Sequence, residues 1–246
     1  MSAPEVRRFG SPQGLADEVA ATLVATLHDA QAEGRVPAVA LTGGTVARTV
    51  HEAIATSASG GDVDWSRVDL WFGDERYVPA DDPERNAAQV AADLLDRLPL
   101  DPERVHPMPA ADAGFASLEE AAEAYAVELR THGAGEFDVV MLGVGPDGHV
   151  ASLFPGFPQL DVDDDITVAV TGSPKPPPLR ISLTYPALNR TRQVWFLVSG
   201  DSKADAVARA LATGDDAADR HEIPAVGVHG RERTVWFLDE AAASRL

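Results

Sequence analysis

Short apolar runs rich in valine recur along the chain, each followed by a turn signal and then by a segment with helical spacing. Several of the runs are apolar at successive positions rather than at alternate ones, which is typical of strands covered on both faces. The predicted strands are 36–44, 68–75, 137–145, 166–172, 194–200 and 234–240, with a shorter candidate at 224–228. Strands separated by helical segments indicate a parallel sheet with crossover helices.

The segments between the runs predict helices. In the first, Ser11 is placed as the N-cap and Pro12 in the first turn, and apolar residues recur at every fourth position from Leu15 to Leu27. Further helices are predicted at 45–57, 84–97, 117–131 and 201–212. Asp201 is the expected N-cap of the last one. This order of elements predicts the α/β class: a doubly wound, mostly parallel sheet with helices on both faces and a ligand site at the carboxyl ends of its strands.

Composition favours one domain, 1–246, that needs no covalent cross-link. With 246 residues, of which 45% are hydrophobic, the chain can bury a substantial core. There is no cysteine, which excludes disulfides, thiolate catalysis and cysteine metal sites. No stretch approaches the roughly 18 apolar residues of a membrane span, and residues 1–14 lack the apolar segment of a signal peptide. We therefore expect a cytoplasmic protein.

The charge of the chain limits its partners. The formal net charge is −19, and the acidic residues are spread along the sequence rather than gathered in a tail. Such a charge opposes binding to nucleic acid or to an anionic membrane. An anionic small molecule must therefore meet a locally basic pocket.

The first candidate site is the turn Thr42-Gly43-Gly44-Thr45, which closes a predicted strand and opens a helix. Backbone N–H groups and the helix N-terminus would point at a ligand there, which suits an anion such as phosphate. An ordinary turn that needs small residues is the alternative. The turn lacks the G-K-[ST] of a P-loop and the G-x-G-x-x-G of a dinucleotide site, which disfavours nucleotide binding.

The second candidate follows the next predicted strand, where Asp74, Glu75 and Arg76 come in succession. Open α/β sheets place their ligands at this end of a strand. Asn86, near the start of the following helix, could reach the same cleft. A solvated loop with internal ion pairs is the alternative.

The third candidate is the turn 143–149, where glycines and a proline surround Asp147 and His149 just past a buried strand. A lone histidine is more often structural than catalytic. Here a carboxylate two residues away could orient and polarise the imidazole, which favours a catalytic pair.

The fourth candidate is the pair Arg180 and Lys203. The proline-rich segment 173–180 predicts a stiff loop that delivers Arg180 to the next strand. Lys203, in the first turn of a predicted helix, opposes the helix dipole, and an anionic ligand would remove that conflict. Arginine and lysine would make a phosphate clamp beside the 42–45 turn, although both could instead be surface charges.

Taken together, these segments resemble the 6-phosphogluconolactonase family, in the superfamily that also holds the glucosamine-6-phosphate deaminases and has a NagB/RpiA-like fold. The motifs that carry the resemblance are LTGGT (41–45), WFGDERYVP (71–79) with Asn86 behind it, LGVGPDGHVASLFPG (142–156), RISLTYPALNR (180–190) and SGDSKADAV (199–207).

The resemblance implies a role for each candidate residue. His149 would be the general base, assisted by Asp147. The residues around the 6-phosphate would be Thr42, Gly43, Gly44, Arg180 and Lys203, with the hydroxyl of Thr45 donating to the same group. Asp74 and Arg76 would line the sugar-acid side of the cleft.

The mechanism that fits these residues is hydrolysis of 6-phospho-D-glucono-1,5-lactone to 6-phosphogluconate, a step of the oxidative pentose phosphate pathway. It needs no cofactor and no metal. Neutral His149 would accept a proton from water, and an ordinary histidine pKa of about 6.5 suits such a base. A cationic side chain such as Arg76 is a candidate for stabilising the oxyanion.

Three alternatives stay open. A glucosamine-6-phosphate deaminase typically has a glutamate after the D-G-H turn, where this chain has Phe154. A sugar-phosphate sensor should add a DNA-binding module, of which the sequence shows no sign. A metal-dependent hydrolase should show a histidine pair with ligand spacing, and the seven histidines form none. A monomer or weak homodimer is expected.

Overall fold

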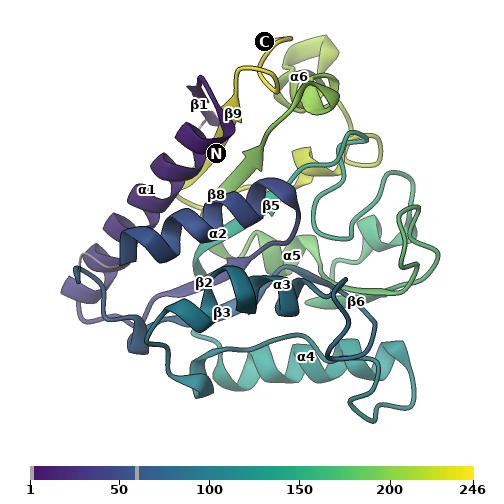
Figure 1. Ribbon diagram of the computed structural model, residues 1–246. Coiled ribbons are helices and arrows are strands. Elements are labelled where there is room, and N and C mark those ends of the chain that lie inside the picture. The colour runs from purple at the N-terminus through teal and green to yellow at the C-terminus, as the bar shows by residue number, and fades with distance from the viewer. Residues whose placement is uncertain (1–2, 59–60) are drawn as a thin grey trace.

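A central sheet of six strands organises the computed structural model, which describes residues 3–58 and 61–246. The strand order is β1-β9-β8-β5-β2-β3, and all neighbouring pairs are parallel. These strands are β1 (Glu5–Phe9), β2 (Ala38–Leu41), β3 (Asp69–Phe72), β5 (Phe137–Gly143), β8 (Thr191–Val198) and β9 (Arg233–Asp239). The first and last strands pair with each other, so the N- and C-terminal strands lie side by side at one edge of the sheet (Figure 1).

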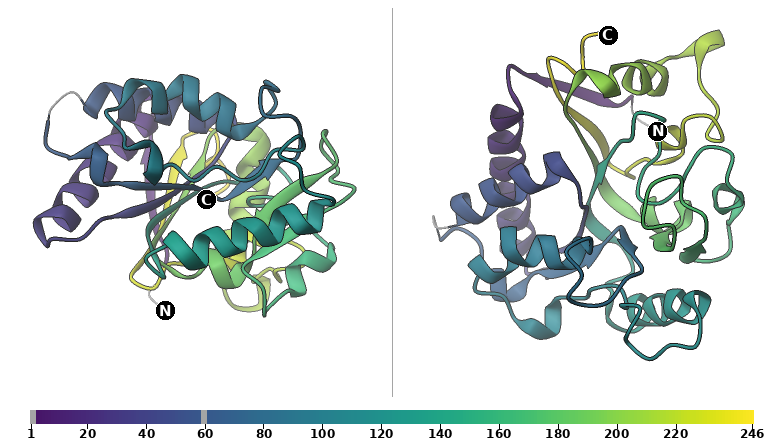
Figure 2. Two further views of the ribbon diagram at one scale, coloured as in Figure 1. Left: turned by 90° about the horizontal axis from the view of Figure 1, so that it is seen from below. Right: turned by 45° about the vertical axis from the view of Figure 1, so that its right-hand side comes forward.

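Helices cover both faces of this sheet. They are α1 (Pro12–Ala32), α2 (Thr45–Ser57), α3 (Asn86–Asp93), α4 (Leu118–His132), α5 (Tyr185–Leu188) and α6 (Ala204–Leu211). Seen from below, the blue helix α2 lies on one side of the strands and the teal helix α4 on the other (Figure 2, left). The mostly parallel, doubly wound α/β fold predicted from the sequence is confirmed. Within the described ranges no helix is long and apolar enough to cross a membrane.

The inner strands have the two-sided burial that their apolar runs predict. All residues of β2 and β3 are buried, as are the first six of β5. The first helix also begins as predicted, because the Ser11 side chain accepts a hydrogen bond from the N–H of Gly14 at 3.1 Å and Pro12 is the first helical residue. Leu15, Val19, Leu23 and Leu27 all face the core.

A second sheet was not predicted. It is antiparallel, has the order β4-β7-β6, and consists of β4 (Asp74–Arg76), β7 (Arg180–Leu183) and β6 (Thr167–Val170). The predicted strand 68–75 is therefore two strands, because Gly73 bonds to Leu41 of the large sheet through its N–H and to Leu183 of the small sheet through its carbonyl. The predicted strand at 166–172 likewise belongs to the small sheet.

One further strand candidate was wrong, and one strand was missed. The candidate at 224–228 is a 3₁₀ helix, Pro224–Gly227, whose first residue has no N–H to donate to a sheet. Strand β1 was missed because its residues include three charged side chains and most of them are exposed, so the segment lacks an apolar run.

The ends of two predicted helices also differ. The helix predicted at 84–97 ends at Asp93 and is followed by a 3₁₀ turn, Leu95–Arg97. At the predicted helix 201–212, Asp201 is not an N-cap: it begins a 3₁₀ turn, Asp201–Lys203, that leads into α6. The Asp239 carboxylate accepts hydrogen bonds from the Gly200 N–H and the Ser199 hydroxyl, and these bonds fix the turn instead of a helix cap.

Candidate active site

A cavity of about 610 Å³ opens at the carboxyl ends of β2, β5 and β8. The residues that end or follow these strands, 42–45, 143–145 and 197–199, form part of its wall. The chain moves from β2 to β3 in one direction across the sheet and from β5 to β8 in the other. The connections therefore diverge between β2 and β5. Ligands of open α/β sheets bind at such a place, because the loops leave room for them.

The structure brings together the residues that the sequence suggested, with the exception of Glu75. The cavity wall contains His149 and Thr42, Gly43, Gly44, Thr45, Asp74, Arg76, Asn86, Arg180 and Lys203. Asp147 contacts the imidazole of His149 through a 2.5 Å hydrogen bond between Nδ1 and Oδ1. The four candidate sites therefore converge on one cavity.

The 42–45 turn presents the beginning of α2 to the cavity. Gly44 is the N-cap residue, with φ at +104°, a conformation that strongly favours glycine. No side chain caps this helix. The backbone N–H groups of its first turn, together with the positive end of the helix dipole, therefore offer an anion site.

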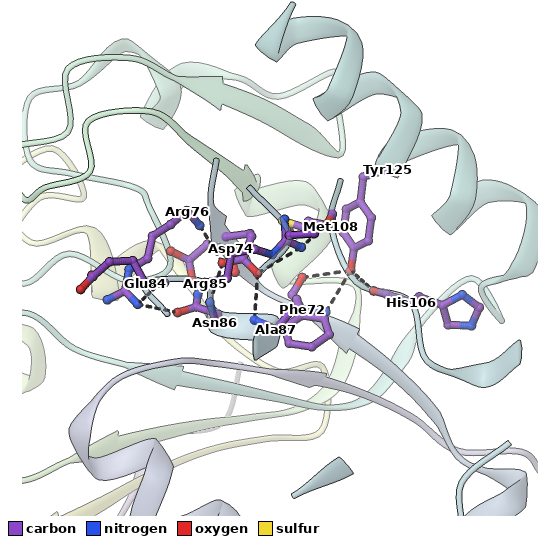
Figure 3. Close-up of polar contacts among 12 residues, drawn as sticks. Phe72, Asp74, Arg76, Glu84, Arg85, Asn86, Ala87, His106, Met108 and Tyr125 are labelled. Atoms are coloured by element: carbon purple, nitrogen blue, oxygen red, sulfur yellow. Dashed lines mark hydrogen bonds and ion pairs between the residues drawn. The ribbon is translucent and has the colours of Figure 1, made fainter. Parts of the chain in front are cut away.

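Asn86 links this turn to the strand β4. Its amide Nδ2 donates to the carbonyl of Asp74 at 2.9 Å and to Asp74 Oδ1 at 3.3 Å. Its Oδ1 accepts from Nη1 of Arg76 at 3.2 Å, and the same Nη1 donates to the carbonyl of Glu84 at 2.6 Å (Figure 3). These contacts fix the positions of Asp74 and Arg76 along the cavity.

Glu75 points away from the cavity, because successive side chains of a strand lie on opposite faces. It is fully buried and accepts hydrogen bonds from the N–H groups of Arg76, Asn86 and Ala87. Burial raises the pKa of this carboxyl, and the Arg85 guanidinium and the three N–H groups oppose that rise. Glu75 therefore joins β4 to the start of α3 and is not available to a ligand.

The His149 side chain is held on several sides. Its ring packs against Phe154, with 4.8 Å between the centroids, and only 14% of the side chain is exposed. A Cβ atom at position 145 would lie 1.9 Å from His149 Nδ1 and 2.4 Å from Asp147 Oδ1, so only glycine fits there. The turn thus places an imidazole and a carboxylate in a fixed relation.

Asp147 is held in its charged form. Burial raises the pKa of its carboxyl, but the hydrogen bond and charge of His149 outweigh that effect and lower the pKa to about 2. In the neutral imidazole, a carboxylate that accepts the Nδ1–H leaves Nε2 without a proton. His149 Nε2 is therefore the nitrogen that can accept one.

Three cations of the cavity wall, Lys175, Arg180 and Lys203, provide the basic pocket that the acidic chain requires. Burial lowers the pKa of all three groups, and for Lys175 the neighbouring Lys203, Arg180 and Arg76 add to the shift. A bound anion would reverse this shift, because it favours the charged form.

Lys175 was not among the predicted site residues. It lies in the proline-rich loop that leads to Arg180, and its Nζ is 3.4 Å from His149 Nε2. The remaining unpredicted polar residues of the wall are Thr49, Ser199 and Ser202. One sequence signal pointed to Lys175: of the 20 lysine and arginine residues, only Lys175 and Lys203 are lysines.

The described parts of the chain contain no group of three or more histidine, aspartate and glutamate side chains that could hold a metal ion.

Known proteins resemble this chain over most of its length. The family model for glucosamine-6-phosphate isomerases/6-phosphogluconolactonase matches residues 10–236, which include the whole cavity wall. A 6-phosphogluconolactonase of Streptomyces coelicolor is 49% identical over 240 residues, covering 94% of this chain and 90% of that protein. A 6-phosphogluconolactonase of Mycobacterium leprae is 43% identical over 247 residues, covering 98% of each.

The fold has solved counterparts. The crystal structure of a 6-phosphogluconolactonase from Thermotoga maritima superposes with a TM-score of 0.83 at 29% sequence identity, covering 96% of this chain and 99% of that one. The likeness therefore extends over nearly the whole length of both chains.

Proposed function

This chain belongs to the glucosamine-6-phosphate isomerase/6-phosphogluconolactonase family, and we propose that it hydrolyses 6-phospho-D-glucono-1,5-lactone to 6-phospho-D-gluconate with His149 as general base. It is an enzyme, as its relatives are. The observation that carries the proposal is the Asp147–His149 pair, which turns one imidazole nitrogen toward a cavity with four cations on its wall.

The proposed reaction begins with water between His149 Nε2 and C1 of the lactone. Nε2 accepts a proton as the water oxygen bonds to C1, and the carbonyl oxygen becomes an oxyanion. The tetrahedral intermediate then breaks the bond between C1 and the ring oxygen, and the imidazolium returns the proton to that oxygen. The sum is addition of one water molecule across an ester bond.

Asp147 supports both halves of this cycle. Its carboxylate stabilises the imidazolium that forms when water is deprotonated, and it holds the tautomer in which Nε2 is free. With a pKa near 2 it stays charged throughout the neutral range. It acts through His149 and is a positioning residue.

The phosphate group would occupy the end of the cavity formed by the 42–45 turn, Arg180 and Lys203. The α2 N-terminus offers N–H donors, Arg180 offers the positive charge of its guanidinium, and Lys203 offers a mobile point charge. Asp74, Arg76 and Asn86 would contact the hydroxyl groups of the sugar acid. Binding the remote phosphate orients C1 against His149, which lowers the entropic part of the barrier.

Phe154 disfavours the deaminase alternative. It is buried, with 1% of its surface exposed, and its ring contacts His149. The related deaminases would have a carboxylate at this position to move protons during ring opening. A phenyl ring cannot take that role, whereas lactone hydrolysis does not require it.

The test is hydrolysis of freshly generated 6-phosphogluconolactone, corrected for spontaneous opening, with EDTA present. The wild-type protein should hydrolyse the lactone rapidly in the presence of EDTA. In His149→Ala, kcat should fall at least about 10²-fold, the usual contribution of a general base. His28→Ala, which changes an exposed histidine, is the matched control. Absence of catalysis by folded wild type would overturn the proposal and would lead to a deaminase assay. The cytoplasmic location, the monomer or weak homodimer and the metal-free mechanism stay predictions.

A further inference from the structure

The two lysines of this chain are both in the cavity, although arginine fills the other 18 of its 20 lysine and arginine positions. Lysine differs from arginine in carrying a compact, strongly hydrated charge whose pKa shifts readily on burial. Lys203 has a place in the phosphate clamp. Lys175 lies on the other side, beside His149, and needs a separate account.

The backbone of Lys175 is fixed by its neighbours. Its N–H donates to the Ser173 hydroxyl at 3.2 Å, and that hydroxyl donates to the Lys175 carbonyl at 2.9 Å. Nη2 of Arg180 donates to the same carbonyl at 3.1 Å. Prolines follow at the next three positions and restrict the chain further. The side chain therefore starts from a rigid base.

The ammonium of Lys175 lies next to the reacting atoms of the proposed mechanism. Its Nζ is 3.4 Å from His149 Nε2, the nitrogen that accepts the proton of water. The attacking oxygen must lie within hydrogen-bond reach of Nε2, roughly 3 Å away, and the lactone carbonyl adjoins that oxygen. An ammonium at this place can reach the carbonyl oxygen.

Arg76, the other candidate for this role, is held elsewhere. Its Nη1 donates to the carbonyl of Glu84 and to Asn86 Oδ1, so the guanidinium is tied to the wall formed by β4 and α3. No contact joins it to the imidazole. Among the described cations of the cavity, Lys175 is the one with a side-chain contact to His149.

The charge of Lys175 is in an unfavourable place until an anion forms. The residue is exposed. Its ammonium nevertheless feels three other cations, Lys203, Arg180 and Arg76, and Asp147 is the carboxylate that offsets them. An oxyanion that develops beside the ammonium relieves this repulsion in the transition state and not before it. Interactions that strengthen only in the transition state raise kcat.

We propose that Lys175 is a catalytic residue whose ammonium donates a hydrogen bond to the lactone carbonyl oxygen and stabilises the oxyanion formed when water attacks C1. Before substrate binds, the same ammonium can donate to His149 Nε2, a contact that the attacking water replaces. This assignment rests on the proposed lactone hydrolysis.

The experiment compares Lys175→Met and Lys175→Arg with Lys203→Met in steady-state hydrolysis of 6-phosphogluconolactone and in competition with inorganic phosphate. Lys175→Met should lower kcat by about 10²–10³-fold, as loss of one oxyanion donor does, with KM and the phosphate inhibition constant changed by less than about threefold. Lys175→Arg, which keeps a charge, should recover part of kcat. Lys203→Met should instead raise KM and the phosphate inhibition constant about tenfold, because it removes a phosphate contact.

A rise in KM and in the phosphate inhibition constant with unchanged kcat in Lys175→Met would make Lys175 a phosphate ligand and overturn the proposal. Unchanged kinetics would overturn it too. Inactivity of wild type would instead reject lactone hydrolysis itself. Thermal unfolding shows whether Lys175→Met has a folding defect. If it does, Lys175→Gln, which keeps a polar side chain of similar reach, tests the proposal by the same changes in kcat and KM.

Discussion

Asn86 occupies the space that a side chain at position 43 would need. A Cβ atom built on Gly43 would lie 2.0 Å from Asn86 Oδ1 and 2.6 Å from its Cγ. The amide cannot move aside cheaply, because it bonds to the Asp74 carbonyl and to Arg76. Asn86 of α3 therefore requires a glycine at position 43, and it couples the 42–45 turn to Asp74 and Arg76.

Gly43→Ala should therefore displace the phosphate turn. We expect a loss of about 1–3 kcal/mol in the free energy of unfolding, as for other overpacked sites, and a KM for lactone raised by roughly tenfold or more. Adding Asn86→Ala should remove the clash, so that the double variant is more stable than the two single losses predict. Gly143→Ala is the control for stability, since a Cβ there meets no atom within 4 Å. Additive losses would show that the amide does not set the position of the turn.

Asp147→Asn tests the orientation of the imidazole. Asparagine can offer its NH₂ to Nδ1, which would favour the tautomer with a proton on Nε2 and remove the acceptor that water needs. We expect kcat to fall by about 10²–10⁴-fold with KM changed little, by analogy with the loss of the aspartate in a serine protease triad. Asp81→Asn, at an exposed aspartate, is the control. If kcat stays within threefold of wild type, the carboxylate does not assist His149.

Arg180→Lys tests the fork geometry of the guanidinium. Nε and Nη2 of Arg180 donate to the carbonyls of Lys175, Pro176 and Pro177. One side chain therefore holds three successive residues of the proline-rich loop. Lysine keeps the charge but cannot reproduce these contacts. We expect KM to rise about tenfold and hydrogen exchange in 173–178 to quicken. Arg8→Lys, at an exposed arginine, should change neither quantity. Unchanged exchange would mean that the prolines alone hold the loop.

The parallel sheet could be predicted from the sequence because its strands are buried on both faces and therefore read as continuous apolar runs. The passage of the chain from the large sheet to the small sheet at Gly73 could not be predicted. The residues on either side of Gly73 form a single apolar-to-charged run, and the break depends on bonds to Leu41 and Leu183, the second of them 110 positions away along the chain. Strand β1 was missed for a similar reason, since its pairing with β9 joins the two ends of the chain.

The site residues could be predicted where chemistry and turn signals coincide, as at Gly43, Gly44 and His149. At Lys175 the turn signals were present, but no neighbouring residue indicated chemistry. A lysine among prolines is typical of an exposed loop, and its contact with His149 spans 26 positions of sequence. The direction in which a loop side chain points is set by tertiary contacts, here the bonds from Ser173 and Arg180 to the Lys175 backbone.

Arg85→Met tests the buried pair beneath the cavity. Arg85 Nη2 is 3.6 Å from Glu75 Oε2, and the two side chains are 5% and 0% exposed. Removing one partner leaves a buried charge, which typically costs about 3–5 kcal/mol. Arg104→Met is the control, because its pair with Asp69 is partly exposed and should contribute about 1 kcal/mol or less.

The loss in Arg85→Met should also depend on pH in a defined direction. Burial already raises the pKa of Glu75, and the variant lacks the guanidinium that opposes this rise. The folded variant therefore binds a proton more tightly than the unfolded chain, so its stability is greatest at acidic pH and falls as the pH rises through the pKa of the folded state. Urea unfolding of wild type and variant from pH 5 to pH 8 measures the difference. A difference that stays constant over this range would show that Glu75 does not carry the charge that Arg85 balances.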